Sequence, residues 1–317
     1  MQVSIPYKNG VTTTTPLRVG VIGLGSNWQN RFRPVLAAER ARFVLRWVYD
    51  ETIQRAAVEA KALGVPYVEG LVEAMNDPNL DAVLLLDHQW FHGWPIEIAC
   101  RLNKPVFCVP YLAGDLGHVE VVCQKVESAK LPLYFDRPAR ANPVSRRLHK
   151  LVSARVGPVR LAFWHSTAEA YSLVDAIDWC LQLFPMPAVQ ARLATIGDPD
   201  DPVVETVLID FGEGRGAQIS RVLQQGRLTR AHVVAEHGTV DLQIPYRLAW
   251  SHRGRVYREK CLMRATLEQQ SLRHFYDALH SDHPEPPRLD DERRTSHVLQ
   301  MIREIATGPE TMSEPEA

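Results

Sequence analysis

The chain has 317 residues, 45% of them hydrophobic and 23% charged, which is typical of a globular protein and excludes a disordered or fibrous one. A formal net charge of −1 excludes the strongly basic surfaces that bind nucleic acid or anionic membranes, and no apolar run reaches the roughly 20 residues that span a bilayer. The first residues also lack the apolar core of a secretory signal, so we expect a cytoplasmic protein with no nucleic-acid or membrane partner.

Residues 17–137 alternate between short apolar strands and helices. This alternation predicts an α/β domain with a parallel sheet covered on both faces, a doubly wound Rossmann-type fold. The predicted strands are 17–23, 43–50, 65–70, 81–87, 104–110 and 131–136, and the predicted helices are 28–39, 51–64, 71–78, 94–103 and 115–130.

After residue 138 the pattern changes to strands separated by turn signals, which predicts an α+β domain with a mostly antiparallel sheet. The predicted strands here are 158–166, 189–196, 203–211, 217–223, 230–245 and 256–263, and the predicted helices are 143–154, 175–184, 267–281 and 290–308. We therefore expect a dinucleotide-binding domain at 17–138, a substrate and oligomerisation domain at 139–308, and loose termini at 1–16 and 309–317.

A glycine-rich turn joins the first strand to the first helix in "VGVIGLGSNW". Gly23 permits a tight turn, Gly25 lets the backbone approach a pyrophosphate, and the helix start that follows, Ser26, Asn27 and Trp28, offers N–H groups to the phosphates. Trp28 stands where a third glycine or an alanine is usual, so a close contact between helix and strand is not expected there. Either Trp28 packs in the core at a domain junction, or it points outward as a hydrophobic wall beside the cofactor.

Asp50 ends the second predicted strand, 25 residues after Gly25. An acid at this place bonds the ribose hydroxyls of a dinucleotide and repels a 2′-phosphate, so we expect NAD rather than NADP. The alternative is that Asp50 only caps the helix that begins near Thr52.

Several segments together resemble the glucose-fructose oxidoreductase / inositol dehydrogenase (Gfo/Idh/MocA) family. They are "LRVGVIGLG…RPVLAAE", "DAVLLLDHQWFHGWPIEIACRLNKPVFC" with His92 at a position where that family often has histidine, "AEHGTVDL" and "RRTSHVLQMIREIATG". The resemblance implies a Rossmann domain, an α+β domain whose exposed sheet face forms a homodimer or homotetramer, and a last helix that returns to the first domain. It also implies an NAD(P)-dependent oxidoreductase acting on a sugar, polyol or related hydroxy compound.

The resemblance fails at the residues expected to move protons. Val109, Pro110 and Tyr111 stand where the family has Glu-Lys-Pro, and Asp175 stands where it has the histidine of an H-x-x-D motif that ends here at Asp178. A positioned acid or base typically contributes on the order of 10²–10⁴-fold, and proline supplies none. The family mechanism therefore does not run here with its usual lysine and histidine.

Other side chains near the expected site are candidates for the missing roles. We predict Asp175 or Tyr111 as the catalytic group and Arg137, Arg140, His165 and Asp178 as substrate residues. An Arg137–Asp175 pair either binds a ligand or forms a buried salt bridge. The predicted cofactor residues are Gly23, Gly25, Ser26, Asn27, Trp28, Asp50, Asp87, His88, His92 and Val109.

Two further alternatives follow from the departures. The first is a non-catalytic binding protein that retains NAD or another ligand as a sensor or partner subunit. The second is a metal site at His88 and His92, which are four residues apart. They fall where a loop passes into a helix, which breaks that spacing, and the five cysteines form no C-x-x-C pair, so we predict no metal and no disulfide.

Overall fold

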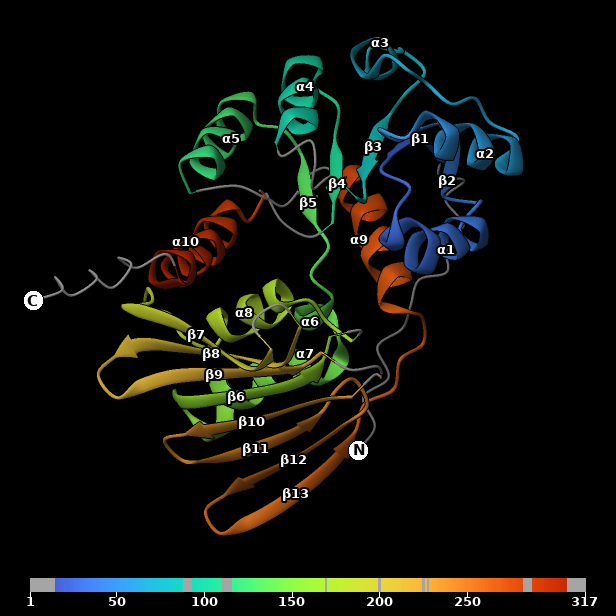
Figure 1. The fold of residues 1–317 in the computed structure, drawn as a ribbon. Coiled ribbons are helices and arrows are strands. Elements are labelled where there is room, and N and C mark those ends of the chain that lie inside the picture. The colour runs from blue at the N-terminus through green and yellow to red at the C-terminus, as the bar shows by residue number, and fades with distance from the viewer. Residues whose placement is uncertain are drawn as a thin grey trace, which may run out of the picture.

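The computed structural model describes residues 15–87, 93–109, 116–168, 170–198, 201–223, 226, 228–281 and 287–306. These residues form two domains, one around a five-stranded sheet and one around an eight-stranded sheet (Figure 1). None of the helices among them is both long and apolar enough to cross a membrane.

The first domain is a parallel sheet in the order β2-β1-β3-β4-β5, so the predicted doubly wound fold is confirmed. Its strands are β1 (Leu17–Ile22), β2 (Phe43–Tyr49), β3 (Ala82–Leu85), β4 (Val106–Cys108) and β5 (Leu133–Phe135). Its helices are η1 (Trp28–Phe32), α1 (Arg33–Ala38), α2 (Ile53–Leu63), α3 (Leu71–Met75), α4 (Trp94–Leu102) and α5 (Leu116–Ala129).

The strand predicted at 65–70 is wrong, because only an isolated bridge between Tyr67 and Val48 forms there. Pro66 has no N–H to donate to a ladder, and Gly64 and Gly70 close the segment on both sides.

Both faces of the first sheet are buried, as a parallel sheet with helices on either side requires. Along β3, Ala82 and Leu84 join one apolar cluster, whereas Val83 and Leu85 join another on the opposite face. The strand therefore holds its carboxyl end rigidly at the edge of the sheet where Rossmann domains bind ligands.

The helix after β1 begins with a π-helical turn, η1, in which the N–H of Arg33 donates to the carbonyl of Trp28, five residues earlier. This turn is wider than an α-helical one. Trp28 is only 1% exposed and packs with Leu24 and Phe32, so the outward-pointing alternative is wrong and the core alternative is observed. The wide turn makes room for an indole where a regular helix would need a small residue.

The second domain contains a mostly antiparallel sheet in the order β13-β12-β11-β10-β6-β9-β8-β7, with β6 and β9 parallel. Its strands are β6 (Val159–Thr167), β7 (Gln190–Asp198), β8 (Asp201–Gly212), β9 (Arg215–Val222), β10 (Thr229–Ala235), β11 (Gly238–Gln243), β12 (Arg247–His252) and β13 (Arg255–Lys260). Its helices are α6 (Pro138–Ala141), α7 (Pro143–Leu151), η2 (Val152–Val156), α8 (Leu173–Leu181) and α10 (Leu289–Ala306), whereas α9 (Leu267–Leu279) packs on the first domain.

Two details of this sheet differ from the prediction. The segment predicted as one strand at 230–245 is the hairpin of β10 and β11, and β12 lies where we predicted no strand. Helices α6, α7 and α8 lie on the side of the sheet that faces the first domain, and no helix of the described residues covers the other side (Figure 1).

The last two helices connect the domains. Leu272, Phe275 and Tyr276 of α9 belong to the apolar cluster of the first domain. Helix α10 buries Val298 and Ile302 in the second domain and binds α5 through an ion pair of Arg293 with Glu120 at 2.7 Å. The two domains are therefore held together by the side chains of α9 and α10.

Candidate functional site

The glycine turn lies directly against the end of β3. Gly23 has a φ of +85°, and a Cβ at this position would lie 2.0 Å from the carbonyl oxygen of Asp87. Only glycine fits such a position, because it tolerates positive φ and has no side chain. Gly23 therefore lets the turn pack directly against the end of β3.

Asp87 places its carboxylate at the start of the helix that follows the turn. It accepts hydrogen bonds from the backbone N–H of Asn27 at 3.4 Å and of Trp28 at 3.2 Å, and from Nδ2 of Asn27 at 3.1 Å. A Cβ on Gly25 would lie 2.9 Å from Cγ of this carboxylate. Burial raises the pKa of Asp87, and its hydrogen bonds only partly oppose that rise.

Asp50 is buried beside the same turn, and both of its carboxylate oxygens have partners, among them Arg55 at 3.4 Å. Its Oδ2 accepts the N–H of Leu24 at 2.8 Å, and its Oδ1 accepts the N–H of Thr52 at 2.9 Å. Thr52 precedes the first residue of α2. Asp50 thus fixes the glycine turn and the start of α2 at the edge where an adenosine ribose lies in Rossmann domains.

Arg31 lies across the cleft from the second domain. Its Nη2 donates to Asp136 at 2.6 Å and its Nε donates to Glu268 of α9 at 3.1 Å. Ser271 of α9 completes the contact by donating to Asp136 at 2.7 Å. Neither Arg31 nor Glu268 was predicted as a site residue, since nothing in a single sequence brings residues so far apart into contact.

Asp175 is the third residue of α8 and forms a capping box with Ser172. Its Oδ2 accepts the N–H of Ser172 at 3.0 Å and the Oγ–H at 2.7 Å, while its own N–H donates back to that Oγ. Burial raises the pKa of Asp175, more than Ser172 and the nearby charge of Arg31 lower it. A carboxyl with a raised pKa that is held by a cap is able to exchange a proton at a fixed position.

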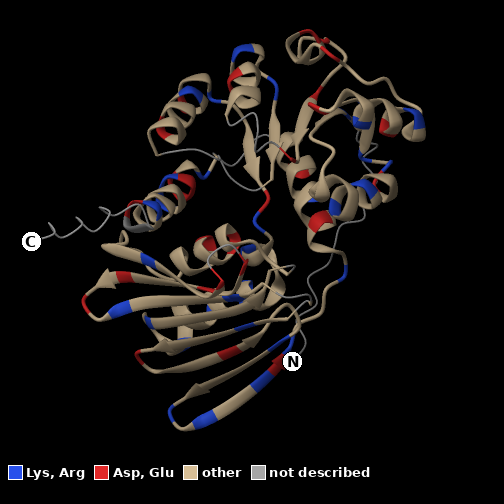
Figure 2. Cartoon of the chain, in the orientation of Figure 1, with Lys and Arg blue, Asp and Glu red and all other residues tan. Residues whose placement is uncertain are grey.

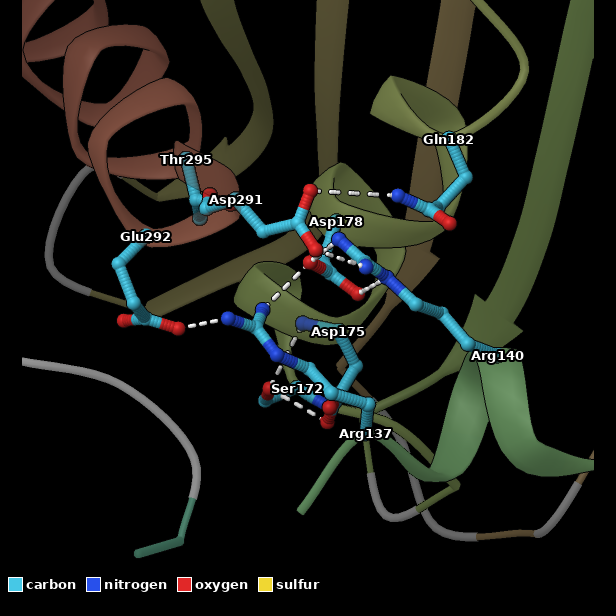
Figure 3. A network of polar contacts seen from close by, with 9 residues as sticks. All are labelled: Arg137, Arg140, Ser172, Asp175, Asp178, Gln182, Asp291, Glu292 and Thr295. Carbon is cyan, nitrogen blue, oxygen red and sulfur yellow. Dashed lines mark hydrogen bonds and ion pairs between the residues drawn. The ribbon is translucent and has the colours of Figure 1, made fainter. Parts of the chain in front are cut away.

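The predicted Arg137–Asp175 pair is wrong. Arg137 pairs instead with Asp178 and with Glu292 of α10, and Arg140 binds both carboxylate oxygens of Asp178 and also Asp291, the last at 2.5 Å (Figure 3). One helical turn separates Asp175 from Asp178, and Asp178 is the nearer acid to both guanidinium groups. Burial lowers the pKa of Arg137, against the opposing effect of Asp178.

This set of five charges, which we call the α6–α8–α10 ion network, contains three of the residues predicted to bind substrate, Arg137, Arg140 and Asp178. Asp178 is 1% exposed and Glu292 is fully buried. The network joins α6, α8 and α10, and Asp175 lies beside it near the start of α8 (Figure 3).

His165 does not lie in the cleft. Ala162, Trp164 and Ser166 of β6 are buried under α8, and the alternation of a strand puts Phe163 and His165 on the opposite, exposed face of the sheet. The prediction of His165 near the substrate is therefore corrected.

The remaining predicted residues divide into two groups. Val109 is buried in the core of the first domain, and Ser26 is exposed at the start of the first helix. His88, His92, Pro110 and Tyr111 lie outside the described residues. In the described part of the chain, no group of three His, Cys, Asp or Glu side chains is placed to hold a metal ion.

Comparison with known proteins gives a consistent set of relatives. Residues 17–132 match the sequence profile of the Gfo/Idh/MocA oxidoreductase family, NAD-binding Rossmann fold. The chain is 24% identical to inositol 2-dehydrogenase 3 of Saccharopolyspora erythraea, over 84% of this chain and 82% of that protein. It is 25% identical to the uncharacterized protein YMR315W of Saccharomyces cerevisiae over 48% of this chain, and it spans only 44% of that relative's length.

Solved structures share the whole fold. The UDP-N-acetylglucosamine 3-dehydrogenase GnnA of Acidithiobacillus ferrooxidans superimposes with a TM-score of 0.77 at 18% identity, over 92% of this chain and 97% of that one. The 3-ketoreductase KijD10 of Actinomadura kijaniata, in complex with NADP, gives a TM-score of 0.74 at 21% identity, over 91% and 97%.

Proposed function

Because the chain belongs to the Gfo/Idh/MocA oxidoreductase family, we propose that it binds a nicotinamide dinucleotide at the Gly23–Gly25 turn and oxidises or reduces a sugar, polyol or related hydroxy compound. The observation that carries this proposal is the position of Asp175. A capped carboxyl with a raised pKa lies on the second-domain side of the cleft, near Arg31 of the nucleotide-binding domain.

The residues of the first domain fit a dinucleotide in most respects. Gly23 and Gly25 lie in the turn between β1 and the first helix, and Asp50 lies at the carboxyl end of β2, where Rossmann domains place an acid beside the ribose. When bound, the nicotinamide supplies the site that gains or loses a hydride. The protein's own task is to hold the two reactants together and to move one proton.

Asp175 performs that proton transfer in the proposed reaction. In the direction of oxidation, the Asp175 carboxylate would take up the hydroxyl proton of the substrate as the C=O bond forms, while a bound oxidised nicotinamide would accept the hydride of the carbinol C–H. In the direction of reduction, protonated Asp175 returns the proton to the new alkoxide. Ser172 holds the carboxyl in place, and Tyr111 is the second candidate for the same role.

A non-catalytic binding role is the second candidate function. The observation that favours it is Asp87, whose carboxylate takes hydrogen bonds from the helix start that a phosphate would otherwise use. Val109 and Pro110 also replace the family's glutamate and lysine. A protein of this kind would retain ligand without turnover.

We expect purified protein to bind NADH at least about tenfold more tightly than NADPH, because Asp50 repels a 2′-phosphate. Native mass spectrometry would detect nucleotide that co-purifies, and quenching of tryptophan fluorescence would give both Kd values. Asp50→Asn should shrink the preference, since it keeps an acceptor for the Leu24 N–H but loses the charge. No binding of either nucleotide at millimolar concentration would refute the proposed function, and tighter binding of NADPH would refute the role of Asp50.

We also propose a homodimer or homotetramer formed through the exposed face of the second sheet. Apolar side chains lie on this face, among them Phe163 at 38% and Leu208 at 51% exposure, while Lys and Arg gather on the edge strand β13 (Figure 2). The double variant F163E/L208E should therefore elute as a monomer when analysed by size exclusion with light scattering. Val58→Glu, at an equally apolar but unrelated exposed position of α2, serves as the control. An unchanged mass for F163E/L208E would contradict this interface.

A further inference from the structure

The phosphate-binding turn already carries an anion that belongs to the protein. The backbone N–H groups of Asn27 and Trp28 point to the carboxylate of Asp87 at 3.4 and 3.2 Å, and Nδ2 of Asn27 adds a third hydrogen bond. Free N–H groups at the start of the first helix are what a Rossmann domain offers to a pyrophosphate. The contact comes from β3, whose end is fixed on both faces by the core.

Gly25 shows where the Asp87 carboxylate and a bound phosphate would occupy the same space. The second glycine of this turn is bare so that a phosphate can approach the backbone. Here the Asp87 carboxyl occupies that approach, because a Cβ on Gly25 would lie 2.9 Å from its Cγ and 3.1 Å from its Oδ1. The space kept open by the glycine is thus filled by a side chain of the same charge as the ligand.

No Lys or Arg among the described residues forms an ion pair with Asp87. Among the partners that the structure describes, its negative charge is therefore balanced by backbone and amide dipoles alone.

We propose that Asp87 sets the affinity of this turn for phosphate-containing ligands, an inference that rests on the proposed nucleotide site. Asp87 acts as an internal anion, and the pyrophosphate of a dinucleotide must displace it from the N–H groups of Asn27 and Trp28. The free energy of binding is therefore reduced by that displacement and by the repulsion between the ligand and a neighbouring carboxylate. The site therefore favours ligands with less phosphate charge, and full-length dinucleotides bind it weakly until Asp87 leaves.

The decisive comparison is between the wild-type chain and Asp87→Asn. Asparagine has the same shape and keeps one oxygen to accept an N–H, so the turn retains a cap, but the charge is gone. We expect Asp87→Asn to bind NADH and NADPH about ten- to a hundredfold more tightly than wild type, by calorimetric titration. Asp87→Ser, which loses both the charge and the reach, should show a gain in the same direction.

The matched control is Asp77→Asn. Asp77 lies before the opposite end of β3, where its Oδ1 accepts the N–H of Asn79, and its removal changes the net charge by the same amount. This variant should leave the Kd for both nucleotides within about twofold, so a general charge effect is separated from a local one. Circular dichroism of all variants confirms that each is folded.

Inorganic pyrophosphate provides a readout that does not need the proposed function. A gain in pyrophosphate affinity for Asp87→Asn supports the inference even when neither protein binds a dinucleotide, a result that would refute the proposed function alone. Unchanged or weaker binding of both pyrophosphate and nucleotide by Asp87→Asn overturns the inference. Weaker binding of nucleotide alone would also overturn it, because Asp87 would then be a ligand-binding group.

Discussion

Replacing Asp175 with asparagine is expected to lower kcat/KM for hydride transfer by about 100- to 10,000-fold, the range of a lost acid–base group. Asparagine cannot take up the hydroxyl proton, although its side-chain oxygen is still able to accept the N–H of Ser172. Nucleotide affinity should change little, because the glycine turn and Asp50 are on the other domain. The rate is followed at the absorbance band of NADH with a panel of sugars and polyols.

Ser172→Ala is the control that separates chemistry from capping. It removes the Oγ that bonds both the carboxyl and the N–H of Asp175, at a cost of about 1 kcal/mol in the free energy of unfolding, but it leaves the carboxyl itself. Its rate should therefore stay far above that of Asp175→Asn. Equal losses in the two variants would assign Asp175 a structural role only, and full activity of Asp175→Asn would shift the proton transfer to Tyr111.

The Asp175 carboxyl also determines the direction in which kcat/KM changes with pH. Burial raises the pKa of Asp175 above the usual range of a carboxyl. Oxidation needs the ionised form, so its kcat/KM should fall as the pH falls through this raised pKa. Reduction needs the protonated form, so its kcat/KM should fall as the pH rises through the same pKa. In Asp175→Asn this titration step should be absent from both profiles.

Asp178→Asn is expected to destabilise the protein by about 3–5 kcal/mol, the cost of removing one partner from a buried ion pair. The substitution leaves the guanidinium groups of Arg137 and Arg140 buried with one carboxylate fewer. The loss is measured as the free energy of unfolding from urea denaturation, followed by tryptophan fluorescence.

Glu236→Gln is the matched control for Asp178→Asn. Its partner Arg160 lies at 2.7 Å, but both side chains are solvent-accessible, with 44% and 31% exposure for Arg160 and Glu236. Such surface pairs contribute between zero and about 1 kcal/mol, because water and salt screen them. If Asp178→Asn cost no more than Glu236→Gln, the α6–α8–α10 ion network would not stabilise the fold.

The fold could be predicted from the sequence because it depends on local patterns of residues. Uninterrupted apolar strands such as 81–87 indicate a buried parallel sheet, and the glycine turn and Asp50 are recognised by their order along the chain. Trp28 was ambiguous for a physical reason. The third glycine is needed only when the helix starts with a regular turn, and a π-helical turn that admits an indole has no sequence signature.

The contacts of the site could not be predicted equally well, because they join residues that are distant in sequence. Arg137 was predicted to pair with Asp175 on the assumption that the family's histidine position faces the substrate, but Asp178 and Glu292 are its partners. The role of Asp87 was also missed, since a carboxylate after a strand reads as a cofactor contact. Only the packing of β3 against the glycine turn shows that it bonds the helix start instead.

The central claim is that this cleft performs hydride transfer with Asp175 in place of the family's usual lysine and histidine. Its most direct test is a single-turnover assay in which wild type and Asp175→Asn, each saturated with NADH or NAD+, are mixed with the panel of sugars, polyols and their keto forms. We predict a change in NADH absorbance for the wild type with at least one substrate and none on the same timescale for Asp175→Asn. Nucleotide that binds to the wild type and never changes its redox state with any substrate would contradict the claim and favour the non-catalytic binding role.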